Sequence, residues 1–167
     1  MLKSRGFTLI ELLTVIFMIG LFSAFAVPGI MSWRDAAKLR GAAENLKGNL
    51  ELAKMKAIQV NGPVAIQFSS DRYMIFVDTG AKDGKLDPDE ELMKSVVLPP
   101  GVKFDLTESS LRDVNADDDN WPQKIRFKGR GTALSGTAVL TNSKKTRAKS
   151  LTVSSLGRIT LANYTLN

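Results

Sequence analysis

Hydrophobic positions divide the chain into an apolar amino-terminal run, an amphipathic stretch and a region of short alternating segments. From Phe7 to Met31 the only charged side chain is Glu11, and the Ser and Thr hydroxyls can bond to the backbone one helical turn back. A helix of this length spans about 37 Å, which exceeds the roughly 30 Å of a bilayer hydrocarbon core. Residues 7–31 therefore predict a transmembrane helix. Because Lys3 and Arg5 precede it, its amino terminus is expected in the cytoplasm.

Residues 32–62 predict an amphipathic continuation of the same helix. Its apolar positions recur at spacings of three and four residues and are Leu39, Ala43, Leu46, Leu50, Ala53, Ala57 and Val60. Charged side chains occupy the other faces. The sequence Asn61-Gly62-Pro63 is expected to end the helix, with Gly62 in the left-handed cap conformation. A single helix from residue 7 to residue 60 would be roughly 80 Å long.

Residues 63–167 change to a pattern typical of β-strands. Segments 64–68 and 73–77 flank a four-residue turn and predict a hairpin. Further strands are expected at 92–98, 102–106, 124–128, 137–141, 150–154 and 158–166, and residues 107–123 are expected to form an exposed loop. Short strands with turns at near-regular spacing indicate an antiparallel sheet or a small sandwich. The predicted fold class is α+β, with a long amino-terminal helix packed on an antiparallel β domain.

The composition excludes several kinds of site. The chain has no Cys and no His, so disulfides, thiol nucleophiles, thiolate metal sites and histidine bases are absent. No catalytic constellation stands out among its Ser and carboxylate residues, and an enzymatic function is not expected. The formal net charge is +6, and removing Lys3 and Arg5 leaves +4 on the side chains.

Glu11 is the most informative residue of the apolar run. A carboxylate at the middle of a membrane helix costs on the order of 2.5 to 3.5 kcal/mol on insertion scales, so an intramembrane Glu indicates a function. Cleavage of the chain after Gly6 would give Phe7 a free cationic amine about one turn from Glu11. The same pair could form between staggered neighbouring chains.

The segment Lys3-Ser4-Arg5-Gly6 followed by Phe7-Thr8-Leu9-Ile10-Glu11 resembles the class III signal sequence of type IV pilins and type II secretion pseudopilins. The resemblance implies that a prepilin peptidase cleaves after Gly6 and methylates the new amino-terminal Phe7. It also implies that Glu11 acts in assembly. Gly20 and Pro28 interrupt the run, and the resemblance implies that Pro28 lets the segment lengthen when subunits leave the membrane for a filament.

Two other interpretations of the amino terminus stay open at this point. One is an ordinary secretory signal peptide cleaved after the small-residue site Ala24-Phe25-Ala26, against which the length of the run and Glu11 both argue. The other is a plain signal anchor in which Glu11 lies near the interface. Pro28 would then be a simple kink at the outer interface, where Trp33 fits an interfacial anchor.

The order of the later segments is similar to that of the GspH/FimT branch of this family, ending in Leu151-Thr152-Val153-Ser154-Ser155-Leu156-Gly157-Arg158-Ile159. The resemblance implies a minor pseudopilin of a type II secretion system, assembled near the tip of a short filament. The alternative is a FimT-like minor pilin that acts in pilus assembly or DNA uptake. Expected partners are prepilin peptidase, other pilins or pseudopilins and the inner membrane. The protein is expected to cross that membrane once, with the β domain in the periplasm, and to enter the filament.

The segment from Asp78 to Glu90 suggests a calcium loop. If Gly84 is the sharp-turn glycine, then Asp83, Asp87 and Glu90 fall at ligand positions. Ala81 cannot ligate, however, and Lys82 and Lys85 add positive charge. The other interpretation is a solvated acidic connection, and apart from calcium no cofactor is expected.

Two basic groups suggest a contact with DNA or an acidic partner. Lys124, Arg126, Lys128 and Arg130 alternate along a strand, and their charged outer face is the simpler interpretation. A second basic cluster in a turn contains Lys144, Lys145, Arg147 and Lys149, and basic faces can bind phosphates. In some FimT-like pilins the DNA contact resembles Gly-Arg-x-Arg. This chain has Arg158 in Gly157-Arg158-Ile159-Thr160, which lacks the second Arg.

Overall fold

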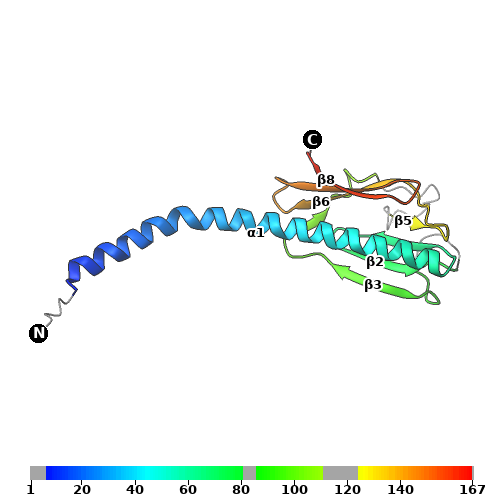
Figure 1. Cartoon of the computed structure of the whole chain (residues 1–167), viewed down its shortest axis with the longest axis horizontal. Coiled ribbons are helices and arrows are strands. Elements are labelled where there is room, and N and C mark those ends of the chain that lie inside the picture. Colours follow the sequence, from blue (N-terminus) through cyan, green and yellow to red (C-terminus); the bar gives the residue numbers. More distant parts are fainter. Residues whose placement is uncertain (1–6, 81–85, 111–123, 167) are drawn as a thin grey trace, which may run out of the picture. The chain divides into compact units, whose positions relative to one another are not determined.

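The computed structural model describes residues 7–80, 86–110 and 124–166, with the backbone alone at residues 25–28. One helix, α1 (Leu9–Gln59), comes first, and all the strands follow it (Figure 1). The chain divides into two compact units at Asp35 and Ala36. The helix is assigned without a break through Gly20 and Pro28. The predicted boundary between a membrane part and a continuation, at residues 31 and 32, stays a prediction.

Within the described residues of the second unit, eight strands form two four-stranded antiparallel sheets. The first sheet has the order β3-β2-β1-β5, and the second has the order β4-β6-β7-β8. The strands are β1 (Val64–Phe68), β2 (Arg72–Val77), β3 (Leu92–Val97), β4 (Val102–Phe104), β5 (Lys124–Phe127), β6 (Gly136–Asn142), β7 (Ala148–Val153) and β8 (Ile159–Tyr164). Each predicted strand is present, and the α+β fold class is confirmed.

The predicted hairpin is formed by β1 and β2, with Phe68 opposite Tyr73. The four-residue turn is closed by the amide of Ser69, which donates to the carbonyl of Arg72 over 2.8 Å. Phe104 of β4 packs edge-on against Phe68, with ring centroids 5.1 Å apart. Its amide also donates to the carbonyl of Ser70 at 2.9 Å. The hairpin is thus joined directly to the second sheet.

One face of α1 fills the core of the second unit. The buried helix residues contact buried side chains of both sheets, which flank this part of α1 in Figure 1. Six of the seven stripe positions predicted from the sequence are buried, namely Leu39, Ala43, Leu46, Leu50, Ala53 and Ala57. The seventh prediction was wrong because Val60 follows the end of α1 and remains 40% exposed.

The helix ends in a Schellman motif centred on Asn61. Asn61 has φ 47°, and its amide donates to the carbonyl of Ile58 at 3.2 Å. The amide of Gly62 donates to the carbonyl of Ala57 at 3.1 Å. The prediction that Gly62 takes the left-handed conformation was therefore wrong by one residue. Asn also tolerates that conformation, so Asn61 can supply the cap.

Gly157 is required where the β7–β8 turn approaches a loop. Its φ is +71°, and a Cβ built there would lie 2.0 Å from the carbonyl oxygen of Gly131. Lys54 of α1 donates to the carbonyl of Gly157 at 2.9 Å and so ties the turn to the helix. A larger residue at 157 would therefore separate three segments that are distant in the sequence.

Two glycine substitutions should have opposite effects on stability. Gly157→Ala is expected to lower the free energy of unfolding by more than about 1 kcal/mol, because of the positive φ and the clash. Gly48→Ala, at an open position of α1, is expected to raise it by roughly 0.5 to 1 kcal/mol. Urea denaturation of the full chain in detergent, followed by circular dichroism, measures both. An unchanged free energy of unfolding in Gly157→Ala would contradict the packing described for this turn.

Candidate functional site

The first unit exposes apolar side chains all round. Every described side chain from Phe7 to Asp35 is exposed, including Phe7 at 84% and Trp33 at 71%. The helix is long and apolar enough to cross a membrane, and its most apolar window is not buried within the chain. A helix that is apolar on every face requires a nonaqueous environment or apolar partners.

Hydroxyl groups in this unit bond to the helix backbone, as the sequence suggested. Thr14 donates to the carbonyl of Glu11 at 2.8 Å, and Ser23 donates to the carbonyl of Ile19 at 2.7 Å. These polar groups therefore need no outside partner. Glu11 is the one charged side chain among the described residues of the apolar run.

Glu11 lies in the first turn of α1. Thr8 precedes the helix, and its hydroxyl accepts a hydrogen bond from the amide of Glu11 at 3.3 Å. The carbonyl of Thr8 accepts a second from the amide of Leu12 at 3.2 Å. A carboxylate in the first turn is favoured by the positive end of the helix dipole. Sequence reasoning missed this cap, although Thr8-x-x-Glu11 has the capping-box spacing.

The other residues of the predicted processing site are only partly described. Phe7 is exposed and lies directly before Thr8, about one turn from Glu11. Gly6 lies outside the described residues. Pro28 lies within α1, where the backbone alone is described. Cleavage after Gly6, methylation of Phe7 and the assembly roles of Glu11 and Pro28 stay predictions.

The predicted calcium loop places Glu90 against backbone amides. Its two carboxylate oxygens accept hydrogen bonds from the amide of Gly80 at 3.0 Å and from that of Asp87 at 3.1 Å. Asp83 lies outside the described residues. Residues 7–80, 86–110 and 124–166 contain no group of three or more carboxylates that could hold a metal. The calcium interpretation therefore stays an untested prediction.

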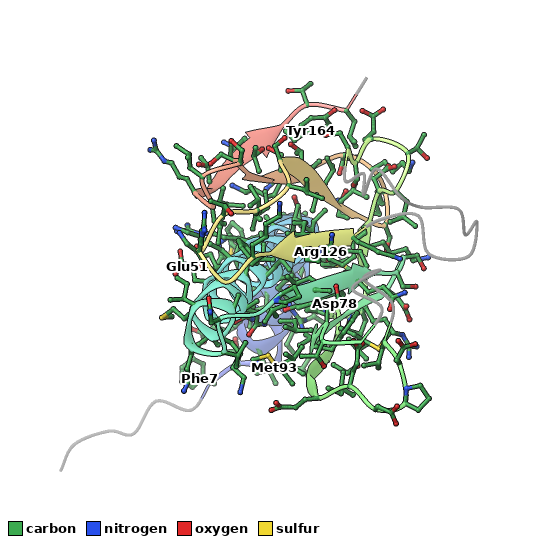
Figure 2. All side chains as sticks on the ribbon, turned by 90° about the vertical axis from the view of Figure 1, so that its right-hand side faces the viewer. Phe7, Glu51, Asp78, Met93, Arg126 and Tyr164 are labelled. Atoms are coloured by element: carbon green, nitrogen blue, oxygen red, sulfur yellow. The ribbon has the colours of Figure 1, made fainter. Side chains whose placement is uncertain are left out.

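The expected charged outer face of β5 was wrong for its first two members. Lys124 is buried, with a relative exposure of 7%. The Arg126 guanidinium forms an ion pair at 3.3 Å with the buried carboxylate of Asp78 (Figure 2). Neighbouring residues on the same face of the sheet, such as Gln67, are also buried. Only Lys128 and Arg130, which follow the end of β5, are exposed.

Lys145 of the predicted basic cluster forms a structural ion pair. Its ammonium lies 2.9 Å from the carboxylate of Asp105, whose side chain is 5% exposed. The other carboxylate oxygen of Asp105 accepts amide hydrogen bonds from Thr107 and Glu108. The Lys145 hydrogen bond, reinforced by these amides, holds the pKa of Asp105 below its usual range. The hydrogen bond to Asp105 likewise raises the pKa of Lys145.

The remaining basic residues do not form one site. Lys144 and Arg147 are exposed in the turn between β6 and β7, where Ala148 begins β7. Arg158 is exposed in the turn at the other end of that strand, next to the pair Val153 and Ile159. The six residues of β7 separate the two turns by about 17 Å. The structure therefore does not bring Arg158 to the Lys144 turn.

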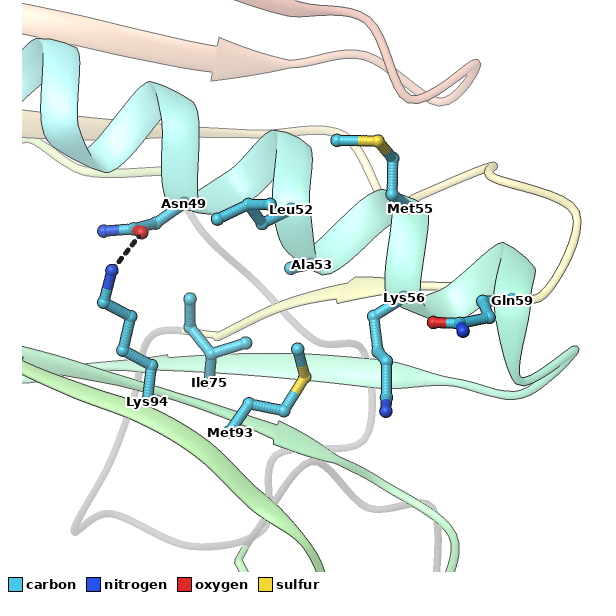
Figure 3. Close-up of a pocket in the computed structure, with 9 residues that line it drawn as sticks. All are labelled: Asn49, Leu52, Ala53, Met55, Lys56, Gln59, Ile75, Met93 and Lys94. Carbon is cyan, nitrogen blue, oxygen red and sulfur yellow. Dashed lines mark hydrogen bonds between the residues drawn. The ribbon is translucent and has the colours of Figure 1, made fainter.

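A groove of about 530 Å³ lies between α1 and the adjoining strands β2 and β3 (Figure 3). Lys94 donates to the side-chain carbonyl of Asn49 at 2.8 Å, and the amide nitrogen of Asn49 donates to the hydroxyl of Tyr73. Burial raises the pKa of Tyr73, while the Asn49 hydrogen bond opposes that rise. The remaining described lining is mostly apolar, with Leu52, Met55 and Met93. These residues supply no nucleophile paired with a base.

Comparisons with known families match nearly the whole chain. The model of the family described as type II transport protein GspH matches residues 42–157. The model described as prokaryotic N-terminal methylation motif matches residues 1–27. No curated protein matches the chain significantly.

Solved structures share the fold at low identity. The minor pseudopilin EpsH of the Vibrio cholerae type 2 secretion system has a TM-score of 0.57 and 15% identity, over 75% of this chain and 97% of that one. The Pseudomonas aeruginosa type IV minor pilin FimU has a TM-score of 0.57 and 17% identity, over 78% and 92%. Escherichia coli GspH has a TM-score of 0.54 and 18% identity, over 76% and 89%.

The ion pair of Asp105 should give stability a defined pH dependence. Because its pKa is lowered in the folded state, its contribution is present above the ordinary Asp pKa of about 3.9 and is lost as pH falls through the lowered value. The difference in unfolding free energy between the wild-type protein and Asp105→Asn should therefore be constant from about pH 5 to 8 and shrink below about pH 4. Urea titrations over this range measure it. A difference that does not shrink in acid would contradict the assignment.

Proposed function

Because the chain belongs to the GspH family of type II transport proteins, we propose that it is a minor subunit of a pilin-like filament. Cleavage after Gly6 and methylation of Phe7 would produce the mature chain. The methylation-motif match at residues 1–27 supports this processing. Glu11 and the new amine of Phe7 would then direct assembly.

The proposal rests mainly on one observation, which is that the two units differ in the burial of their apolar side chains. In the second unit, the apolar face of α1 is buried against the sheets. In the first unit, large apolar side chains are exposed on every side of the helix. A cleavable leader followed by such a helix fits a subunit that waits in a membrane and then packs with the helices of other subunits. The same contrast supports a single-pass location in the inner membrane, with the β domain in the periplasm.

We assign the filament to a type II secretion system, where the protein would lie at or near the pseudopilus tip. The family description and the likeness to EpsH and GspH favour this machine. A minor pilin of a type IV pilus system is the second candidate, favoured by an equal TM-score to FimU. The family is structural, and the described hollows offer no arrangement that would support catalysis.

Processing predicts the mass of the mature chain. Intact mass spectrometry of the protein purified from its own membranes should give a chain that begins at Phe7 and carries one added methyl group. Loss of the prepilin peptidase should leave residues 1–6 attached. A mature chain that begins at Val27 would instead show an ordinary signal peptide and exclude a membrane-anchored subunit.

The machine can be identified from the proteins that a deletion strain fails to secrete. We expect a defined set of exoproteins to disappear from the culture supernatant and to return with the wild-type gene. Glu11→Ala should not restore them, because the assembly carboxylate is lost. Glu51→Ala, a matched removal of an exposed carboxylate from the later part of α1, should restore them.

The two candidate machines give different outcomes in this assay. An unchanged supernatant together with lost twitching or DNA uptake would assign the protein to a type IV pilus. Full rescue by Glu11→Ala would contradict the proposed role of the carboxylate in either machine.

A further inference from the structure

A second hollow, of about 360 Å³, lies between the first turns of α1 in the second unit and the adjoining ends of β7 and β8. Ala36, Leu39 and Arg40 line it from the helix. Arg147 and Lys149 line it from the start of β7. The structure thus brings Arg147 and Lys149, which the sequence grouped with Lys144 and Lys145, together with Arg40 of α1.

The described lining contains three cations and no carboxylate. Arg40 forms an exposed ion pair with Glu44 on the solvent side of α1, at 2.8 Å, and Lys149 donates to the side chain of Asn163. An exposed ion pair contributes little free energy, and Asn163 is neutral, so an anion in the hollow can compete for both cations. The side chain of Arg147 is exposed. Among the described residues, no carboxylate lies within ion-pair distance of its guanidinium. The hollow is therefore a basic surface whose positive charge is only weakly neutralised by other side chains of the protein.

The position of the hollow along the chain limits what can reach it. Ala36 follows Met31, the end of the predicted span, by five residues, or about 7 Å of helix. The headgroup layer on each side of a bilayer is roughly 5 to 7 Å thick. Trp33, which is exposed at 71%, lies between them, as is common for aromatic residues at a membrane interface. Along the helix, Ala36 is therefore expected at the outer edge of the headgroup layer, and Arg40 follows Met31 by about 13.5 Å, from where its long side chain can reach back to the lipid phosphates.

Lipid phosphates fit this surface better than DNA does. Nucleic-acid binding without base contacts requires an extended row of cations along the phosphate backbone. These three cations surround one small hollow. Lys144 is exposed in the same turn as Arg147, but Arg158 lies at the far end of β7, so the cations do not form an extended row with it. The half-buried ring of Tyr164 supplies apolar surface beside the charges, as an amphipathic interface requires, whereas Leu39 is buried beneath them.

We propose that Arg40, Arg147 and Lys149 bind the phosphates of anionic phospholipids at the membrane surface beside the span. The inference rests on the proposed membrane anchoring of the subunit. The domain would then lie against the bilayer before assembly, with the turn at residues 143–147 close to the headgroups.

The test measures the approach of that turn to the lipid surface. The chain has no Cys, so Ser143→Cys places one donor fluorophore in the β6–β7 turn of the full chain. The protein is reconstituted in nanodiscs of phosphatidylcholine, with or without phosphatidylglycerol, that carry an acceptor-labelled headgroup. Energy transfer from residue 143 should rise with phosphatidylglycerol and fall again with salt, because exposed charges are screened over about 10 Å at 0.1 M. Ser155→Cys, in the β7–β8 turn, is the distant control label.

Matched charge variants assign the effect to the hollow. Changing Arg40, Arg147 and Lys149 together to Gln should reduce the ratio of docked to undocked protein by at least about tenfold, since each cation near an anionic surface favours binding roughly fivefold. Changing Lys128, Arg130 and Arg158 together to Gln removes the same charge from exposed positions outside the hollow and should leave the transfer unchanged. Equal thermal midpoints would show that both variants fold.

Three results would overturn the inference. Transfer that does not depend on phosphatidylglycerol, in protein that elutes with the discs, would overturn lipid binding and leave the anchoring intact. Protein that does not enter discs at all would overturn both. Binding of a short duplex DNA that requires the three cations, without a lipid-dependent rise in transfer, would identify DNA as the partner of this surface.

Discussion

The second unit depends on the burial of one face of α1 between two sheets. Leu46 and Leu50 are fully buried there, and each such side chain contributes about 1.5 to 3 kcal/mol relative to exposure. Ala53 and Ala57 are also fully buried and are small, so the strands can approach the helix axis closely. Neither sheet could bury its inner face without this helix. The cap at Asn61 and the Lys54 contact to Gly157 keep the end of the helix and a distant turn in the geometry that the burial requires.

The hydrophobic pattern of the sequence was sufficient to predict elements whose side chains are buried at a fixed period. The helix stripe has such a period and was predicted at six of its seven positions. The strands were located by their short apolar runs between turns, although strands such as β1 are buried on both faces. The predictions failed where contacts between distant segments determine whether a side chain is buried and what it pairs with. Alternation placed Lys124 and Arg126 on an outer face, but that face is also buried and Asp78 pairs with Arg126. Spacing in the sequence could not show that Lys145 reaches Asp105, because that contact depends on how distant segments pack. The separation of Arg147 from Arg158 by one strand did follow from the predicted strand at 150–154.

In the proposed assembly, Glu11 would serve both the start of α1 and the contact between subunits. Thr8 caps α1 and places Glu11 in its first turn, where a carboxylate is favoured by the unpaired amides of the helix start. That position is also the one closest to a new amine at Phe7. A carboxylate further along α1 would lie far from both the unpaired amides of the helix start and the amine of Phe7. The capping-box spacing therefore explains how a carboxylate proposed to act in assembly could be held in an otherwise apolar run.

In the proposed filament, apolar burial alone cannot drive a subunit out of the membrane. The side chains of residues 7–31 are surrounded by lipid tails before assembly and by neighbouring helices after it, and lipid tails are about as apolar as Leu. The direction of transfer must then be set by packing and by polar groups. Glu11 gains by pairing with an amine in a medium of low dielectric, because an unpaired carboxylate there is costly. Cations that contact lipid phosphates would oppose departure. The balance between Glu11 at one end of the span and the basic hollow at the other would therefore decide when the subunit leaves.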